Sequence, residues 1–146
     1  MDERVRALLG ATRLRVLEDV FALIHLPVAA YPALLNQLGQ IDTSGFLTLV
    51  RSAEEVTWLT TEAGWARVAH TWPSATVEAG WRLITLEQTI SLDVSGYLAP
   101  LAQALAERNI PLLVVSAFST DHLLVHGADL SAAVEALRGA IEASKT

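Results

Sequence analysis

The sequence predicts an α+β protein with two ferredoxin-like units of the βαββαβ type in tandem, each an antiparallel sheet with helices on one face. Short β-rich runs joined by a polar turn occur twice, at residues 46–60 and 110–125. An offset of 66 residues overlays 46–60 on 112–126 without a gap. Chance explains any single matched pair, but a constant offset over a helix and a hairpin is typical of a duplicated unit.

Residues 73–80 read as a connector, which divides the chain into a first unit over 1–79 and a second over 80–146. The first unit is degenerate and opens with a short N-terminal helix. Each unit lacks one strand of the full plan, which a partner unit could supply. In the first unit we expect a helix over 2–9, a buried strand over 20–26 that Pro27 stops, a helix over 30–38 with Pro32 near its start, a hairpin over 46–60 and helical turns over 62–68.

In the second unit, a buried strand over 80–86 precedes a helix that Pro100 constrains. Proline costs no intrahelical hydrogen bond only in the first turn, so the helix cap is expected near Ser95 or Gly96. A strand from Ile110 to Ala117, a turn over 118–121 and a return strand over 123–125 follow. The last helix, 130–141, has Asp129 as its expected cap.

Composition excludes several classes of function. The net charge is −6 without a basic cluster, whereas nucleic-acid binding needs a basic surface. The longest apolar stretch, 20–35, contains two prolines and is shorter than the roughly 20 residues of a membrane span. The N-terminus lacks the pattern of a secretory signal, so we expect a cytoplasmic protein. No cysteine is present, which excludes thiol catalysis and cysteine metal sites.

Neither a metal site nor a catalytic site is expected, and no cofactor. His122 and His126 have the spacing of helical zinc ligands, but the apolar residues between them indicate a strand. Four strand residues span about 13 Å, too far for one ion. Asp121 beside His122 suggests a triad, yet adjacent strand residues point to opposite faces. The four tryptophans fit a core or an interface.

The segment Val115–Val125, Val-Ser-Ala-Phe-Ser-Thr-Asp-His-Leu-Leu-Val, resembles the signature of ACT domains in the CASTOR-like and aspartate-kinase branch. The resemblance extends upstream to 80–86 and to Ser95–Gly96, and downstream from Asp129 to 138. It implies that the loop opening the helix grips the carboxylate of a free amino acid across a domain interface. The aspartate of the hairpin turn would then hold the cationic group.

By position, the resemblance assigns ligand binding to nine residues of two segments: Asp93, Val94, Ser95, Gly96, Tyr97, Phe118, Ser119, Thr120 and Asp121. Free N–H groups at a helix start suit a carboxylate, and an aspartate suits an ammonium group. The alternative is that Ser95 only caps the helix and Gly96 only turns the chain. Ala117, Ser119 and His122 depart from the family pattern, which leaves the ligand's identity open.

The sequence therefore favours a regulatory or sensory protein that binds an amino acid and self-associates, as a dimer or larger homo-oligomer, without catalysis. In the first unit Ala29–Ala30 stand where the second has Ser95–Gly96, so one type of site per chain is expected. The alternative is a ligand-free ACT-like module that dimerises or docks on a partner enzyme. A weaker third hypothesis is an enzyme with a ferredoxin-like core.

Overall fold

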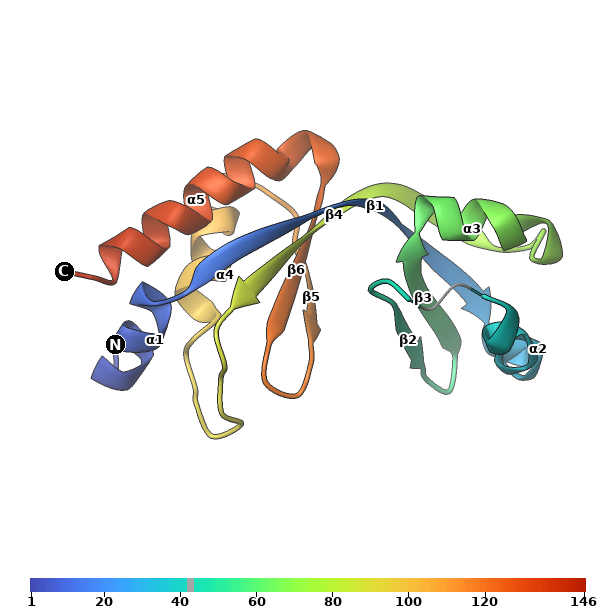
Figure 1. Cartoon of the computed structure of the whole chain (residues 1–146), viewed down its shortest axis with the longest axis horizontal. Helices are drawn as coiled ribbons and strands as arrows, with labels where there is room; N and C mark the ends of the chain where they lie inside the picture. The colour runs from blue at the N-terminus through green and yellow to red at the C-terminus, as the bar shows by residue number, and fades with distance from the viewer. Residues whose placement is uncertain (42–43) are drawn as a thin grey trace. The chain divides into compact units, whose positions relative to one another are not determined.

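A computed structural model describes residues 1–41 and 44–146, and these form two compact units. The terminal unit contains residues 1–18 and 82–146, and the central unit contains residues 19–81. Two long strands, β1 (Arg13–Pro27) and β4 (Thr76–Glu87), each contribute to both units (Figure 1). The structure thus differs from the expected division at residue 79/80, because residues 1–18 pack with the C-terminal half of the chain.

In the terminal unit the strands follow the order β1-β4-β6-β5. Its remaining elements are α1 (Glu3–Gly10), α4 (Ala99–Ala106), β5 (Leu113–Ser116), β6 (Asp121–His126), a 3₁₀ turn η4 (Gly127–Asp129) and α5 (Leu130–Ala143). Because α1 and the first part of β1 belong to this unit, the N-terminus supplies the strand that the pattern of 80–146 lacked. This α+β arrangement with an antiparallel hairpin confirms the predicted fold class at the level of the unit.

One face of this sheet packs against the helices. Alternate residues of the strands are buried there, with Ile84 and Leu86 in β4 and Leu123 and Val125 in β6. The helices present their apolar stripes to the same core, whose helical members are Val5, Leu9, Leu101, Leu105, Ala133, Ala136, Leu137 and Ile141. Helices on one face, as predicted, are therefore present in this unit.

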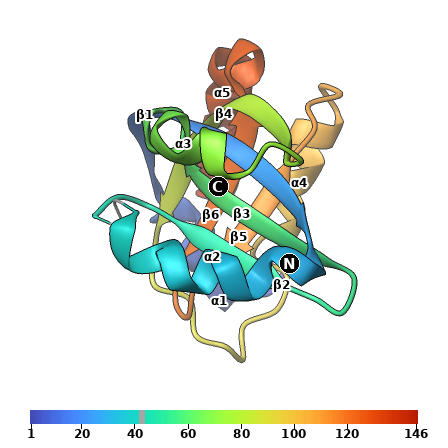
Figure 2. The same ribbon diagram turned by 90° about the vertical axis from the view of Figure 1, so that its right-hand side faces the viewer.

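The central unit has the strand order β2-β3-β1-β4. Its elements are η1 (Val28–Ala30), α2 (Tyr31–Gln37), η2 (Leu38–Gln40), β2 (Thr48–Arg51), β3 (Glu55–Thr61), α3 (Glu62–Val68) and η3 (Ala69–Thr71) (Figure 2). Strand β3 pairs antiparallel with β1, from Phe21 opposite Thr61 to Pro27 opposite Glu55. A separate core forms around Ile24, Leu34 and Trp58, all fully buried.

Both predicted hairpins are present, and their strands pair in the same pattern. The innermost pairs are Arg51 with Val56 and Ser116 with Asp121, each enclosing four residues. The registers superpose at an offset of 65, not at the expected 66. A shift of one residue moves every side chain to the other face. The observed offset matches Trp58 with Leu123, which both belong to the apolar cores of their units.

One expected boundary is wrong. Strand β4 begins at Thr76, so part of the proposed connector 73–80 is strand. Its Gly80 has a φ of +84° and donates its backbone N–H to the Glu62 carboxylate at 2.7 Å. Helix α5 begins at Leu130 with Asp129 in the N-cap position, as expected, although the Asp129 side chain forms no capping hydrogen bond.

A buried hydroxyl pair links the N-terminal segment to the loop before α4. Tyr97 is 3 % exposed, and its Oη lies 2.7 Å from Thr12 Oγ1. Thr12 Oγ1 donates in turn to the Leu8 carbonyl oxygen at 2.8 Å, so the Tyr97 hydroxyl donates to Thr12. This chain of hydrogen bonds holds residues 1–18 to the loop that bears the predicted site.

We therefore expect Tyr97→Phe to lower the free energy of unfolding by about 0.5–1.5 kcal/mol, the net contribution of one hydrogen bond. Urea unfolding monitored by circular dichroism measures the change. Tyr31→Phe is the control, because the Tyr31 hydroxyl has no hydrogen-bond partner among the described residues. An equal loss in both variants would contradict the role assigned to the Tyr97 hydroxyl.

Candidate ligand-binding site

The structure brings together the loop after β4 and the turn between β5 and β6. The Ile90 N–H donates to the Ser119 carbonyl oxygen at 2.8 Å, although 29 positions separate these residues in the sequence. The Ala117 N–H donates to the Thr120 carbonyl oxygen at 2.9 Å and closes the turn. Both predicted binding segments therefore border the same end of the terminal sheet.

The loop reaches α4 later than the sequence predicted. Helix α4 begins at Ala99, with Leu98 as its cap, and Pro100 still lies in the first turn. Gly96 has a φ of +88°, a left-handed conformation that cannot open a helix. The expected cap at Ser95 or Gly96 is therefore wrong by two to three residues.

Burial divides the predicted residues of this loop into two groups. Tyr97 lies in the core, and Val94 packs against it. Ser95 and Gly96 are exposed, and a Cβ atom added to Gly96 would meet no atom within 4 Å. Ser95 and Gly96 therefore offer exposed backbone groups to an approaching ligand.

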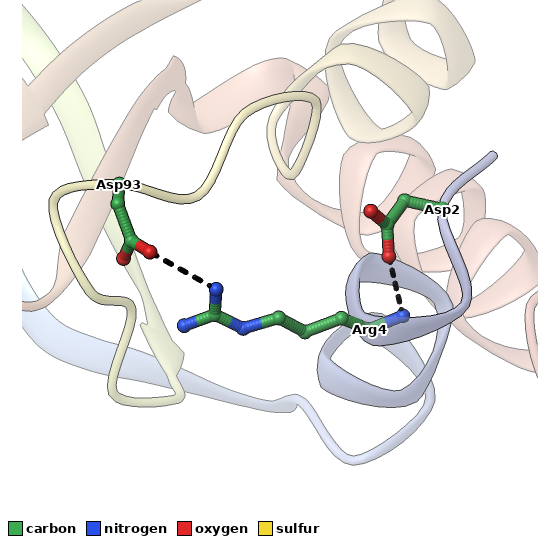
Figure 3. Close-up of polar contacts among 3 residues, drawn as sticks. All are labelled: Asp2, Arg4 and Asp93. Carbon is green, nitrogen blue, oxygen red and sulfur yellow. Dashed lines mark hydrogen bonds and ion pairs between the residues drawn. The ribbon is translucent and has the colours of Figure 1, made fainter.

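Asp93 is engaged by the N-terminal helix. Its carboxylate lies 3.1 Å from Arg4 Nη1, while the backbone N–H of Arg4 donates to the capping carboxylate of Asp2 at 2.7 Å (Figure 3). The hydrogen bond and the charge of Arg4 lower the pKa of Asp93. Both side chains of the ion pair are more than half exposed, so the pair ties the loop to α1 with little net stabilisation.

The residues of the turn point in different directions. Phe118 is 82 % exposed at the tip. The side chain of Asp121 lies on the same face of β6 as those of Leu123 and Val125, toward the helices, because side chains alternate along a strand. Burial raises the pKa of the Tyr97 hydroxyl, and the charge of Asp121 raises it further. Asp121 therefore lies near the 93–97 loop, as the predicted site requires.

Thr120 instead borders an open polar hollow of about 620 Å³ with Arg15, Thr85, Glu87, Gln88 and Thr89. Glu87 pairs with Arg15 at 3.3 Å and with Arg13 at 3.6 Å. No motif in the sequence pointed to these residues. They come from β1, β4 and the following loop, which only strand pairing brings together.

His122 lies beside this hollow, and its Nδ1 is 2.9 Å from Thr85 Oγ1. Burial lowers the pKa of His122, and Arg15 lowers it further, while Asp121 acts in the opposite direction. Within residues 1–41 and 44–146, no three histidine, aspartate or glutamate side chains gather as metal ligands would. His122 is thus a neutral hydrogen-bonding group of the sheet at neutral pH.

Comparison with known proteins identifies the family. Residues 76–139 match the family model of the ACT domain. These residues of the chain form an ACT domain. The match covers β4, α4, the hairpin β5–β6 and most of α5, and hence both predicted binding segments. No curated protein matches the chain in sequence.

Solved structures share the fold over nearly the whole chain. A protein from Agobacterium tumefaciens is 24 % identical, with a TM-score of 0.70 and 89 % of each chain covered. The ligand-free regulatory subunit of aspartate kinase from Thermus thermophilus is 11 % identical, with a TM-score of 0.66, and the match covers 88 % of this chain and 97 % of the subunit. The aspartate kinase of Clostridium acetobutylicum, an allosteric enzyme, is 14 % identical, with a TM-score of 0.71, covering 88 % of this chain and 34 % of the kinase.

The chain therefore shares its fold with these solved structures, among them a regulatory subunit of aspartate kinase.

Where the structure describes the chain, no helix has the length and apolar character to cross a bilayer.

The lowered pKa of His122 predicts a pH-dependent stability. The unfolded state binds the proton more readily, so stability is present above the ordinary pKa near 6.5 and falls as pH drops through the folded-state value. His122→Gln should remove the loss of stability that protonation of His122 causes between neutral and mildly acidic pH. Urea unfolding of both proteins across that range measures the free energy of unfolding at each pH. An equal decrease in both proteins would contradict this prediction.

Proposed function

We propose that this protein is a regulatory or sensory ACT protein whose terminal unit binds a free amino acid between residues 93–97 and 118–121. The observation that carries the proposal is the hydrogen bond from Ile90 to Ser119, which joins the loop that leads to residues 93–97 with the turn 118–121, inside the ACT match. Each segment alone is an ordinary loop, whereas together they combine polar groups of opposite character at one place.

In this site the exposed backbone at Ser95 and Gly96 receives the carboxylate, since a residue without Cβ lets the ligand approach the chain. Asp121 holds the ammonium group through a charge-assisted hydrogen bond. Val94 and Tyr97 shape the loop from the core side, and Asp93 holds it to Arg4. Phe118 and Ser119 enclose the ligand from the turn, whereas Thr120 borders the polar hollow.

We further propose that the central unit is a degenerate ACT-like copy, so that the chain is a tandem of two units. The common hairpin register and the position of Pro32 and Pro100 in the first turn of α2 and α4 support this relationship. The segment before α2 contains no Ser-Gly pair, and the motif-type site belongs to the terminal unit alone. The role is regulatory, in the cytoplasm, and not catalytic.

The alternative, a ligand-free dimerisation or docking module, is favoured by the edge of the terminal sheet. Strand β5 ends the strand order, and Leu113 and Val114 are 37 % and 43 % exposed. Phe118 continues this apolar edge. An unprotected edge strand pairs readily with another chain, so a homodimer through β5 follows on either hypothesis.

The amino-acid site predicts a ligand-dependent melting temperature. A ligand at a hundred times its dissociation constant stabilises the fold by about 2.7 kcal/mol, which corresponds to roughly 5–11 °C here. A screen of the protein amino acids, one at a time, measures this shift. Asp121→Ala should abolish it, because the ammonium group loses its partner. Asp2→Ala is the control, since it removes an acid outside the site.

A shift that survives Asp121→Ala would place the ligand elsewhere, and the absence of any shift would favour the docking module. Gly96→Val should also abolish the shift by blocking the backbone. Because Gly96 has a positive φ, that variant is also strained, and its melting temperature without ligand must be compared first.

The exposed edge predicts a dimer at micromolar concentration in light scattering. Val114→Lys should convert it to a monomer, because a lysine on the edge opposes pairing. Val50→Lys is the matched control on β2, the edge of the central unit, where Val50 is 60 % exposed. A monomeric natural protein, or a dimer that tolerates Val114→Lys, would contradict pairing through β5.

A further inference from the structure

The central unit contains a small polar pocket remote in sequence from the ACT motif. It has a volume of about 260 Å³ and lies where β3 passes into α3, against residues 44–46. Its chemistry comes from six side chains: Asp19, Ser44, Phe46, Thr60, Thr61 and Arg67. None of the nine residues predicted to bind a ligand borders this pocket.

Two opposite charges, those of Asp19 and Arg67, line the pocket. Among the residues that the structure describes, neither Asp19 nor Arg67 forms an ion pair or a side-chain hydrogen bond. A carboxylate and a guanidinium group on one small pocket suit a molecule that carries one cationic and one anionic group. Arg67 offers a planar set of donors that matches a carboxylate.

The floor of the pocket is polar. Thr60 is 3 % exposed, and its Oγ1 forms no hydrogen bond to the described residues. Thr61 Oγ1 instead accepts the Gly64 N–H at 3.0 Å. The Thr60 hydroxyl is not one of the fully buried polar atoms that lack a partner, so it reaches the pocket and can bind a ligand there.

Gly64 keeps the two threonine hydroxyls uncovered. A Cβ atom at position 64 would lie 3.0 Å from Thr61 Oγ1 and 3.2 Å from Thr60 Oγ1. On another side, the Phe46 ring packs edge-to-face against the fully buried ring of Phe21 at 6.0 Å. The pocket thus combines a polar floor, an apolar wall and two charged groups.

We propose that this pocket is a second binding site, for a small zwitterion of the α-amino-acid class. Asp19 takes the ammonium group, Arg67 takes the carboxylate and Thr60 adds a hydrogen bond. The volume lies below the roughly 300–1,000 Å³ of drug-sized ligand sites, which limits the ligand to a small molecule. The site is independent of the one proposed in the terminal unit, because the two share no residue.

The test uses the full chain with Asp121→Asn, which disables the site of the terminal unit. Isothermal titration with the protein amino acids, one at a time, should find a ligand that still binds. Its N-acetyl derivative lacks the ammonium group and its carboxamide lacks the carboxylate, so both should fail. Adding Asp19→Asn or Arg67→Gln should weaken binding by roughly tenfold to a hundredfold, the effect of losing one charged hydrogen bond.

Glu18→Gln and Arg51→Gln are matched controls, since each removes the same type of charge outside the pocket. Binding that is equally strong after Asp19→Asn and Arg67→Gln would overturn the proposal. Binding to the natural protein that Asp121→Asn abolishes would also overturn it, while supporting the ACT site. The reverse result, with loss on Asp19→Asn and none on Asp121→Asn, would support this pocket and refute the ACT site. No binding in either background would refute both.

Discussion

The structure of the terminal unit depends on the alternation of side chains along β4 and β6. Ile84, Leu86, Leu123 and Val125 can meet the helices only if each strand keeps its register, because a slip of one residue would turn them to the opposite face of the sheet. Burial of this face therefore determines where the β5–β6 turn lies. The Ile90–Ser119 hydrogen bond, and with it the meeting of loop and turn, follows from that register.

The same alternation separates neighbouring residues of the turn. Asp121 lies on the helix side near Tyr97, whereas Thr120 borders the polar hollow with Arg15 and Thr85. A motif that is continuous in sequence thus serves two surfaces. The proposed amino-acid site uses the helix side, where the Asp121 carboxylate lies.

The two units show how one plan can carry different chemistry. Both contain the same hairpin register, and both begin a helix with a proline in the first turn. The terminal unit retains polar residues at the loop and turn. In the central unit Asp19 and Arg67, which form no ion pair with the described residues, lie instead on the pocket where β3 meets α3. A unit without the motif can therefore still carry a polar pocket.

The sequence by itself determined the hairpins, the helical segments, the placement of Pro100 in a first turn and the ACT resemblance that the family match confirms over 76–139. These features rest on local rules, in which period and turn residues act over a few positions. Tertiary structure alone decided that residues 1–18 join the terminal unit and that the hairpins correspond at 65 and not 66 positions. It also decided that Arg15, Thr85 and Thr120 share one hollow. Each of these depends on strand pairing between distant segments, whose register follows from burying a common face and from no short stretch of sequence.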